Sequence, residues 1–145
     1  MKTWTVVLIF LFHLKASALF CTCVLSELHE DDFRHASTIV WGKVVQVTHY
    51  GEHAQEKLVT FKVYRSYKGS TEAFIELRTQ DESMCGLTLV KGEKWLLFVS
   101  KRNTVGLCSP NVRYSKHGDE TPAMVENRLK KFHRYIEKIK TYEKL

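Results

Sequence analysis

The sequence lacks the short motifs that identify the commonest enzyme active sites. Neither a phosphate-binding glycine loop nor a G-x-S-x-G nucleophile motif occurs in the 145 residues. The serines have no recognisable catalytic-triad context. The histidines are spread out, and His49 and His53 flank a predicted turn instead of sharing one helix face, so they lack the spacing of a shared metal site. These absences argue against an enzyme and predict neither a cofactor nor a metal ion of the protein's own.

Long apolar runs are also scarce, and the only strong one lies near the start of the chain. Residues 6–12 (VVLIFLF) follow the positive Lys2 and precede Ala16-Ser17-Ala18, a small-x-small pattern typical of signal peptidase cleavage. The run is shorter than the ~20 apolar residues that span a bilayer, which disfavours a retained membrane anchor. The sequence therefore predicts a signal peptide at residues 1–20, no transmembrane segment, and a secreted, extracellular protein.

Two cleavage points remain open. Cleavage after Ala18 follows the small-residue rule and leaves Leu19 and Phe20 ahead of Cys21. Cleavage after Phe20 would make Cys21 the first residue, although a bulky residue then occupies the last leader position. The choice decides whether Cys21 carries a free amine or an amide nitrogen.

The four cysteines, Cys21, Cys23, Cys85 and Cys108, all follow the leader. An even number of cysteines behind a secretory leader predicts disulfides. The absence of any C-x-x-C spacing argues against a structural zinc site and a thioredoxin-like redox pair. Disulfide geometry disfavours a bond between Cys21 and Cys23, so each is expected to reach Cys85 or Cys108, in either combination. Each long-range bridge is worth roughly 4 kcal/mol on the chain-entropy model. Both would hold the start of the mature chain, normally a mobile region, in one place.

The charge of the mature chain is mildly basic. Without the leader, 20 basic and 16 acidic side chains leave a net charge of +4. This charge favours polyanions or acidic partners without singling one out. A weak net charge and a secreted location argue against a nucleic-acid partner.

The middle of the chain is rich in strand signals. A short helix capped by Ser26 is predicted at residues 25–36, before the strands begin. Only two prolines occur, Pro110 and Pro122, and both follow the strand-rich region. Close spacing and short turns predict a mainly β sandwich or small barrel, and a closed barrel would also avoid open sheet edges. The predicted strands, five or six in number, cover residues 38–48, 57–67, 73–79, 87–90, 94–100 and 105–109.

The C-terminal tail predicts a long amphipathic helix. Thr121 is a suitable N-cap and Pro122 suits the first helical position. Apolar residues then recur at helical spacing, and lysines and arginines cover the opposite face. The helix either packs on the sheet with a solvated outer face or contacts a polyanion. The apolar stripe comprises Val125, Leu129, Phe132, Ile136 and Ile139, and the candidate polyanion contacts are Lys130, Lys131, Arg134 and Lys138.

Several short motifs occur along residues 21–110. They are CTCV at 21–24, TIVWGKV at 38–44, VYRSYKG at 63–69, ESMCG at 82–86, and WLLF at 95–98 followed by Cys108. In this order they resemble the tissue inhibitors of metalloproteinases and, more broadly, the netrin-like module. The resemblance implies a netrin-like OB-fold domain at residues 21–120, with a basic amphipathic helix at 121–145 packed on it. It also implies the disulfide pairs Cys21–Cys85 and Cys23–Cys108.

The resemblance further implies a mechanism of inhibition. In inhibitory members, the amine and carbonyl oxygen of the first cysteine, here Cys21, chelate the catalytic zinc of an extracellular metalloproteinase. The next side chain, here Thr22, enters the primed-side specificity pocket. The implied protease-contact residues are Cys21, Thr22, Cys23, Val24, Leu25, Ser83, Met84, Cys85 and Gly86.

This sequence also departs from the family pattern. Residues 25–28 (LSEL) replace the proline-containing segment after Cys23, no third disulfide is available, and no cysteine-rich second subdomain follows. An alternative function is therefore a non-inhibitory netrin-like module that binds a matrix polyanion or a receptor through the basic helix or a barrel face.

Overall fold

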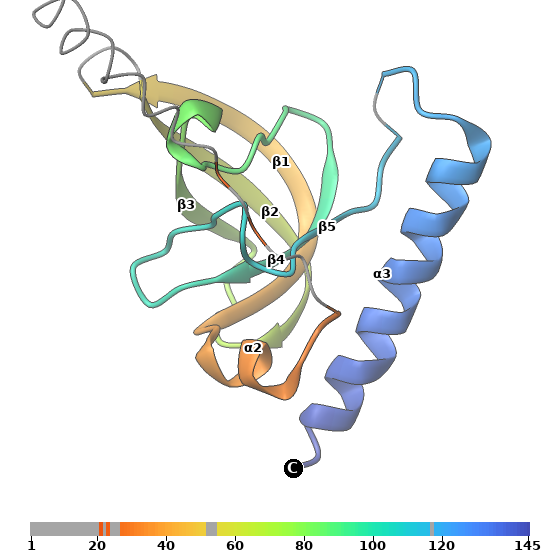
Figure 1. The fold of residues 1–145 in the computed structure, drawn as a ribbon. Coiled ribbons are helices and arrows are strands. Elements are labelled where there is room, and N and C mark those ends of the chain that lie inside the picture. The colour runs from red at the N-terminus through yellow and green to blue at the C-terminus, as the bar shows by residue number, and fades with distance from the viewer. Residues whose placement is uncertain (1–20, 22, 24–26, 52–54, 117) are drawn as a thin grey trace, which may run out of the picture.

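A single antiparallel sheet with one long helix dominates the fold (Figure 1). The computed structural model describes Cys21, Cys23 and residues 27–51, 55–116 and 118–145. The strand order is β3-β2-β1-β4-β5, and each neighbouring pair is antiparallel. The elements are α2 (Glu30–His35), β1 (Thr38–Tyr50), β2 (Glu56–Lys68), β3 (Phe74–Gln80), the 3-10 helix η2 (Glu82–Met84), β4 (Lys94–Val99), β5 (Val112–Arg113) and α3 (Pro122–Tyr142).

The fold is mainly β, as the sequence predicts, but its sheet does not close into a barrel. Within the described part of the chain, β3 is hydrogen-bonded to neither β4 nor β5, so the sheet has an opening between its two edges. Two isolated bridges link residues near this opening, Arg78 with Thr104 and Gly86 with Gly106. The segment after β4 therefore lies against the edge of β3 without forming a strand there.

Two predicted strands are wrong. Residues 87–90 and 105–109 are not strands, and β5, which the sequence did not predict, lies after Pro110. The hydroxyl of Thr79 exchanges two hydrogen bonds with Leu87, accepting from its amide at 3.0 Å and donating to its carbonyl at 3.3 Å. The Thr79 side chain thus satisfies the backbone amide and carbonyl of Leu87, which a neighbouring strand would otherwise satisfy. Leu87 can therefore be buried without belonging to a strand.

β1 contributes to two separate hydrophobic cores because its alternate side chains point to opposite faces. Val40 and Val44 pack into the first core, with residues from β2, β3, β4 and the segments around Leu87 and Val105. Ile39 packs into the second core, where Trp41 also contacts the buried residues. The second core lies between the sheet and the two helices.

The long helix α3 covers this second face of the sheet (Figure 1). The predicted cap is confirmed, since the Thr121 hydroxyl accepts from the Met124 amide at 3.3 Å and Pro122 opens the helix. The buried face consists of Phe132, Tyr135, Ile136 and Ile139, whereas Val125 and Leu129 of the predicted stripe are only partly buried.

An ion cluster fastens the start of α3 to β5. One carboxylate oxygen of Glu120 contacts both Arg113 of β5 and Arg128 of α3. The three side chains are 14%, 22% and 13% exposed, respectively. Their burial makes this cluster a structural connection between helix and sheet.

The short N-terminal helix is smaller than predicted. It spans Glu30–His35, and its N-cap is His29, whose amide donates to the Asp32 carboxylate at 2.9 Å. The acidic residues of its first turn suit the positive end of a helix. The predicted cap Ser26 lies outside the described residues. No helix in the described part of the chain has the length and apolar character needed to cross a membrane.

Candidate functional site

Two disulfides attach Cys21 and Cys23, which precede the sheet, to two of its loops. Cys21 is bonded to Cys85 and Cys23 to Cys108, with Cα–Cα distances of 5.4 and 5.2 Å. This is the pairing that the resemblance implies. Cys85 directly follows η2, and Cys108 lies between β4 and β5. Cys21 and Cys23 are thereby fixed to segments that are 64 and 85 residues away in sequence, respectively.

Asp81 organises the loop that carries Cys85. Its carboxylate accepts from the Ser83 amide at 3.2 Å, and its carbonyl accepts from the amides of Met84 and Gly86 at 2.9 and 3.0 Å. Cys85 adopts a left-handed conformation with φ of 60°. The turn therefore bends the chain sharply at the residue that bonds Cys21.

The carboxyl group of Asp81 has a second, ionic partner. Lys57 of β2 places its ammonium nitrogen 3.4 Å from the other carboxylate oxygen. The hydrogen bond from the Ser83 amide, followed by that from Lys57, lowers the pKa of Asp81 below its ordinary value of 3.8. The charged form of Asp81 is thus the one that holds the loop.

The two loops that receive the disulfides are also connected to each other. Gly86 forms a bridge with Gly106, and the Leu107 amide donates to the Cys85 carbonyl at 3.3 Å. The attachment points of both disulfides consequently belong to one hydrogen-bonded unit. A partner that contacts this part of the surface would meet loops that are already ordered. We call this surface, formed by residues 81–86 and 106–108, the ridge.

The loop residues predicted to contact a protease differ in accessibility. Ser83, Met84 and Cys85 are exposed, and 44% of the Met84 surface is accessible. Gly86 is buried, so it shapes the loop instead of offering a contact surface. Cys21 and Cys23 are half-buried beside the loops. The predicted contacts Thr22, Val24 and Leu25 lie outside the described residues.

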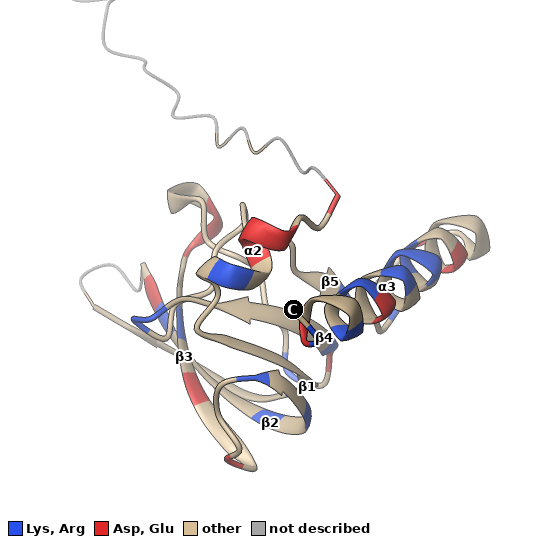
Figure 2. Ribbon diagram, turned by 90° about the horizontal axis from the view of Figure 1, so that it is seen from below, with Lys and Arg blue, Asp and Glu red and all other residues tan. Residues whose placement is uncertain are grey.

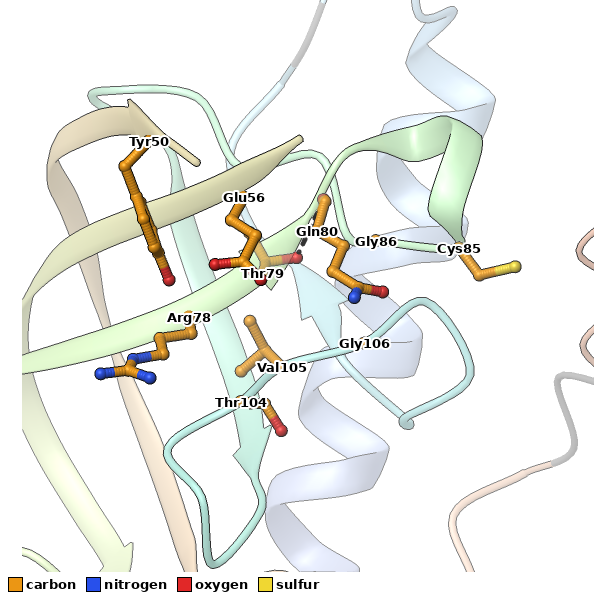
Figure 3. A pocket seen from close by; sticks show the side chains of 10 residues that line it. All are labelled: Tyr50, Glu56, Arg78, Thr79, Gln80, Cys85, Gly86, Thr104, Val105 and Gly106. Carbon is orange, nitrogen blue, oxygen red and sulfur yellow. Dashed lines mark hydrogen bonds between the residues drawn. The ribbon is translucent and has the colours of Figure 1, made fainter. Parts of the chain in front are cut away.

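A cleft of about 390 Å³ adjoins this ridge. Figure 3 shows the side chains of Tyr50, Glu56 and Arg78 around the cleft, with Cys85 at one end. Tyr50, Glu56 and Gln80 are neighbours in register across β1, β2 and β3. The sequence does not predict this cleft, because only strand register brings these residues together.

The basic residues of α3 are largely engaged within the protein. Lys130 pairs with Glu126 at 2.7 Å, Arg134 pairs with Glu27 at 2.7 Å, and Lys138 lies 3.7 Å from Glu27. The remaining candidate, Lys131, lies over the Tyr135 ring at 5.2 Å. Figure 2 accordingly shows acidic and basic segments interspersed along α3.

Lys138 also donates to the Leu28 carbonyl at 3.1 Å. Because Leu28 is fully buried in the second core, α3 holds the segment that follows the N-terminal cysteines. The face predicted to contact a polyanion therefore contributes internal contacts to the N-terminal region.

Comparison with known proteins assigns no family. No protein-family model matches the chain, and no curated protein matches it significantly. Groups of three or more potential metal ligands are absent from the described residues. A function must therefore be inferred from the disulfides, the loop they attach to and the distribution of surface charge.

Proposed function

We propose that the protein is a secreted inhibitor of extracellular zinc metalloproteinases. The observation that carries this proposal is the attachment of both N-terminal cysteines, two residues apart, to adjoining loops through Cys85 and Cys108. Disulfides of this kind are consistent with an extracellular protein. The open sheet, with two bridges near its opening, is compatible with the OB-like barrel that the resemblance implies.

The chemistry requires Cys21 to be the first residue of the mature protein. A free α-amine has a pKa of about 7.7–8.0, so a useful fraction is deprotonated near neutral pH. A catalytic zinc ion keeps an open coordination position that an amine nitrogen can occupy. The amine and carbonyl oxygen of Cys21 would chelate that zinc, while the Thr22 side chain enters the primed-side pocket.

The loop beside Cys21 would supply the rest of the contact surface. Ser83 and Met84 are exposed next to the disulfide to Cys85 and would contact the rim of the protease cleft. Because the disulfides and the Asp81 hydrogen bonds order this ridge before binding, little conformational entropy remains to be lost on association. Preorganisation of this kind increases affinity without adding contacts.

The decisive experiment compares three forms of the protein against a panel of zinc endopeptidases. One form begins at Cys21, one begins at Leu19, and the third begins at Cys21 with its amine acetylated. Only the first is expected to inhibit, because the other two present an amide nitrogen to the zinc. Intact mass of the secreted protein before and after reduction identifies the natural start and both bridges. Equal inhibition by all three forms, or none by the first, would contradict the proposal.

The alternative, a polyanion-binding role for α3, has less support. Lys130, Arg134 and Lys138 already have carboxylate partners within the chain. A polyanion would compete with Glu126 and Glu27 for these cations. The basic face of α3 is therefore a weaker candidate contact than its sequence suggests.

A further inference from the structure

Three lysines lie side by side across the middle of the sheet. Lys43 of β1 is directly opposite Lys62 of β2 and, on its other side, directly opposite Lys94 of β4. Neighbouring strands lie about 4.8 Å apart, so the row extends over about 10 Å. We call these three residues the lysine row.

The lysine row lies on the same face of the sheet as the second core, where Lys62 is exposed and Lys43 and Lys94 are half-buried. Val44, Phe61 and Trp95, each adjacent to one of the lysines in sequence, are buried in the first core. Since side chains alternate along a strand, the lysines point away from that core. Leu96, two residues beyond Lys94, belongs to the second core on this opposite face.

The ammonium groups of the lysine row have no counter-ion in the part of the chain that the structure describes. Within the described residues, none of the three forms an ion pair, in contrast to Lys130, Lys138 and Lys140 of α3. Like charges directly opposite each other on adjacent strands destabilise a sheet. An external anion would relieve this repulsion, which makes an anion the natural partner for the row.

Aromatic side chains lie beside the lysine row. Phe74 of β3 is directly opposite Lys62 and is 52% exposed. Tyr64 is 43% exposed, and its ring contacts that of Trp41 at 5.3 Å between centroids. Exposed aromatic faces next to cations suit a ligand that combines a ring surface with negative charge.

We propose that the lysine row, with Tyr64 and Phe74 beside it, binds a sulfated polysaccharide. The sulfates would pair with the three ammonium groups while sugar rings lie against the aromatic side chains. Charge complementarity extends beyond the row, because the chain without its predicted leader carries 20 basic and 16 acidic side chains, a net charge of +4. The two disulfides favour an extracellular polyanion over a nucleic acid. The site does not depend on metalloproteinase inhibition.

Heparin affinity chromatography of the full mature protein tests this assignment. The triple variant Lys43→Gln, Lys62→Gln, Lys94→Gln should elute at much lower salt than the wild type. The matched control, Lys130→Gln, Lys131→Gln, Lys140→Gln, removes the same charge from α3 and should elute close to the wild type. By the counterion-release relation, the slope of log affinity against log salt should fall by about two to three units for the sheet variant alone. Equal losses for both variants, or no retention of the wild type, would overturn the proposal.

Further measurements separate the ligand classes and check the fold. Desulfated heparin, single-stranded DNA and phosphatidylserine vesicles should bind more weakly than heparin, and equal binding to DNA or vesicles would overturn the polysaccharide assignment. The sheet variant should melt at the same temperature as the wild type or higher, because like-charge repulsion is removed. If the triple variant does not fold, Lys62→Gln alone, at an exposed position, must still lower the elution salt. Protease inhibition should be unchanged in each case.

Discussion

The carbonyl oxygen of Gln80 occupies the position that the Cβ of any larger residue at position 86 would need. Gly86 directly follows Cys85, and its amide closes the turn onto the Asp81 carbonyl at 3.0 Å. The missing side chain lets the disulfide loop pack against the end of β3. This contact, more than the conformational freedom of glycine, explains why glycine is required there.

Substitution Gly86→Ala should therefore destabilise the protein and displace the disulfide loop. Overpacking of this kind typically costs about 1–3 kcal/mol in the free energy of unfolding. Gly106→Ala is a matched control, because a Cβ there meets nothing within 4 Å although Gly106 is the bridge partner of Gly86. Urea unfolding measures both variants. An equal effect at the two positions would refute the steric explanation.

Removal of the Cys23–Cys108 disulfide should lower stability substantially. The bond closes a loop with a sequence separation of 85 residues, for which the chain-entropy model gives about 4–5 kcal/mol. Replacement of both cysteines by serine, followed by chemical denaturation, measures the loss. The Cys21–Cys85 bond and the N-terminal amine remain in this variant, so any loss of inhibition reports on ordering of the ridge. A loss of stability below about 1 kcal/mol would mean that the bridge constrains the unfolded chain very little.

Substitution Glu120→Gln should loosen α3 from the sheet. The change removes the charge that Arg113 and Arg128 share. Arg113 then keeps the more distant Glu93, at 3.7 Å, whereas the buried guanidinium of Arg128 loses the carboxylate that it contacts. Breaking a buried ion pair from one side costs about 3 kcal/mol or more. Glu126→Gln is the control, since its pair with Lys130 is about two-thirds exposed and therefore contributes little to stability. Thermal unfolding of the two variants should differ clearly, and similar melting temperatures would contradict a structural role for the cluster.

The disulfide loop should weaken at acidic pH through Asp81. The Ser83 amide and Lys57 lower the pKa of Asp81 below 3.8, so its contribution to stability is complete above that value. The contribution is lost as the pH falls through the lower folded-state pKa, because the protonated carboxyl no longer stabilises these contacts. The melting temperature of the wild type should exceed that of Asp81→Asn above pH 4, and the difference should shrink below it. A difference that stays constant down to pH 2 would exclude this role.

Strong local signals predicted much of the fold. β-branched residues and turn glycines indicated β1, β2, β3 and β4 to within a few residues. Thr121 and Pro122 marked the start of α3, because capping and proline geometry depend only on neighbouring residues. Segments without a decisive local pattern were predicted wrongly. Leu87 and Leu89 alternate as in a strand, yet Thr79 satisfies the backbone of Leu87 from a side chain.

Some features of the candidate site can be read from the sequence, and others depend on tertiary contacts. The cysteines and the ESMCG loop could be identified from the sequence, whereas the Asp81–Lys57 contact and the cleft beside Tyr50 could not. The internal partners of Arg134 and Lys138 were equally hidden, because Glu27 is more than a hundred residues away in sequence. Charge visible in the sequence thus overestimated how much of α3 is available to a ligand.

The sequence by itself determined the four long strands, the C-terminal helix and the presence of four cysteines behind an apolar segment, because helix caps, strand alternation and local composition are properties of neighbouring residues. Only the tertiary structure decided that the sheet stays open, that α3 uses its cations internally, and that Lys43, Lys62 and Lys94 form one row. These features depend on strand register and on contacts between distant segments. A shift of one residue in register would turn each lysine to the other face of the sheet.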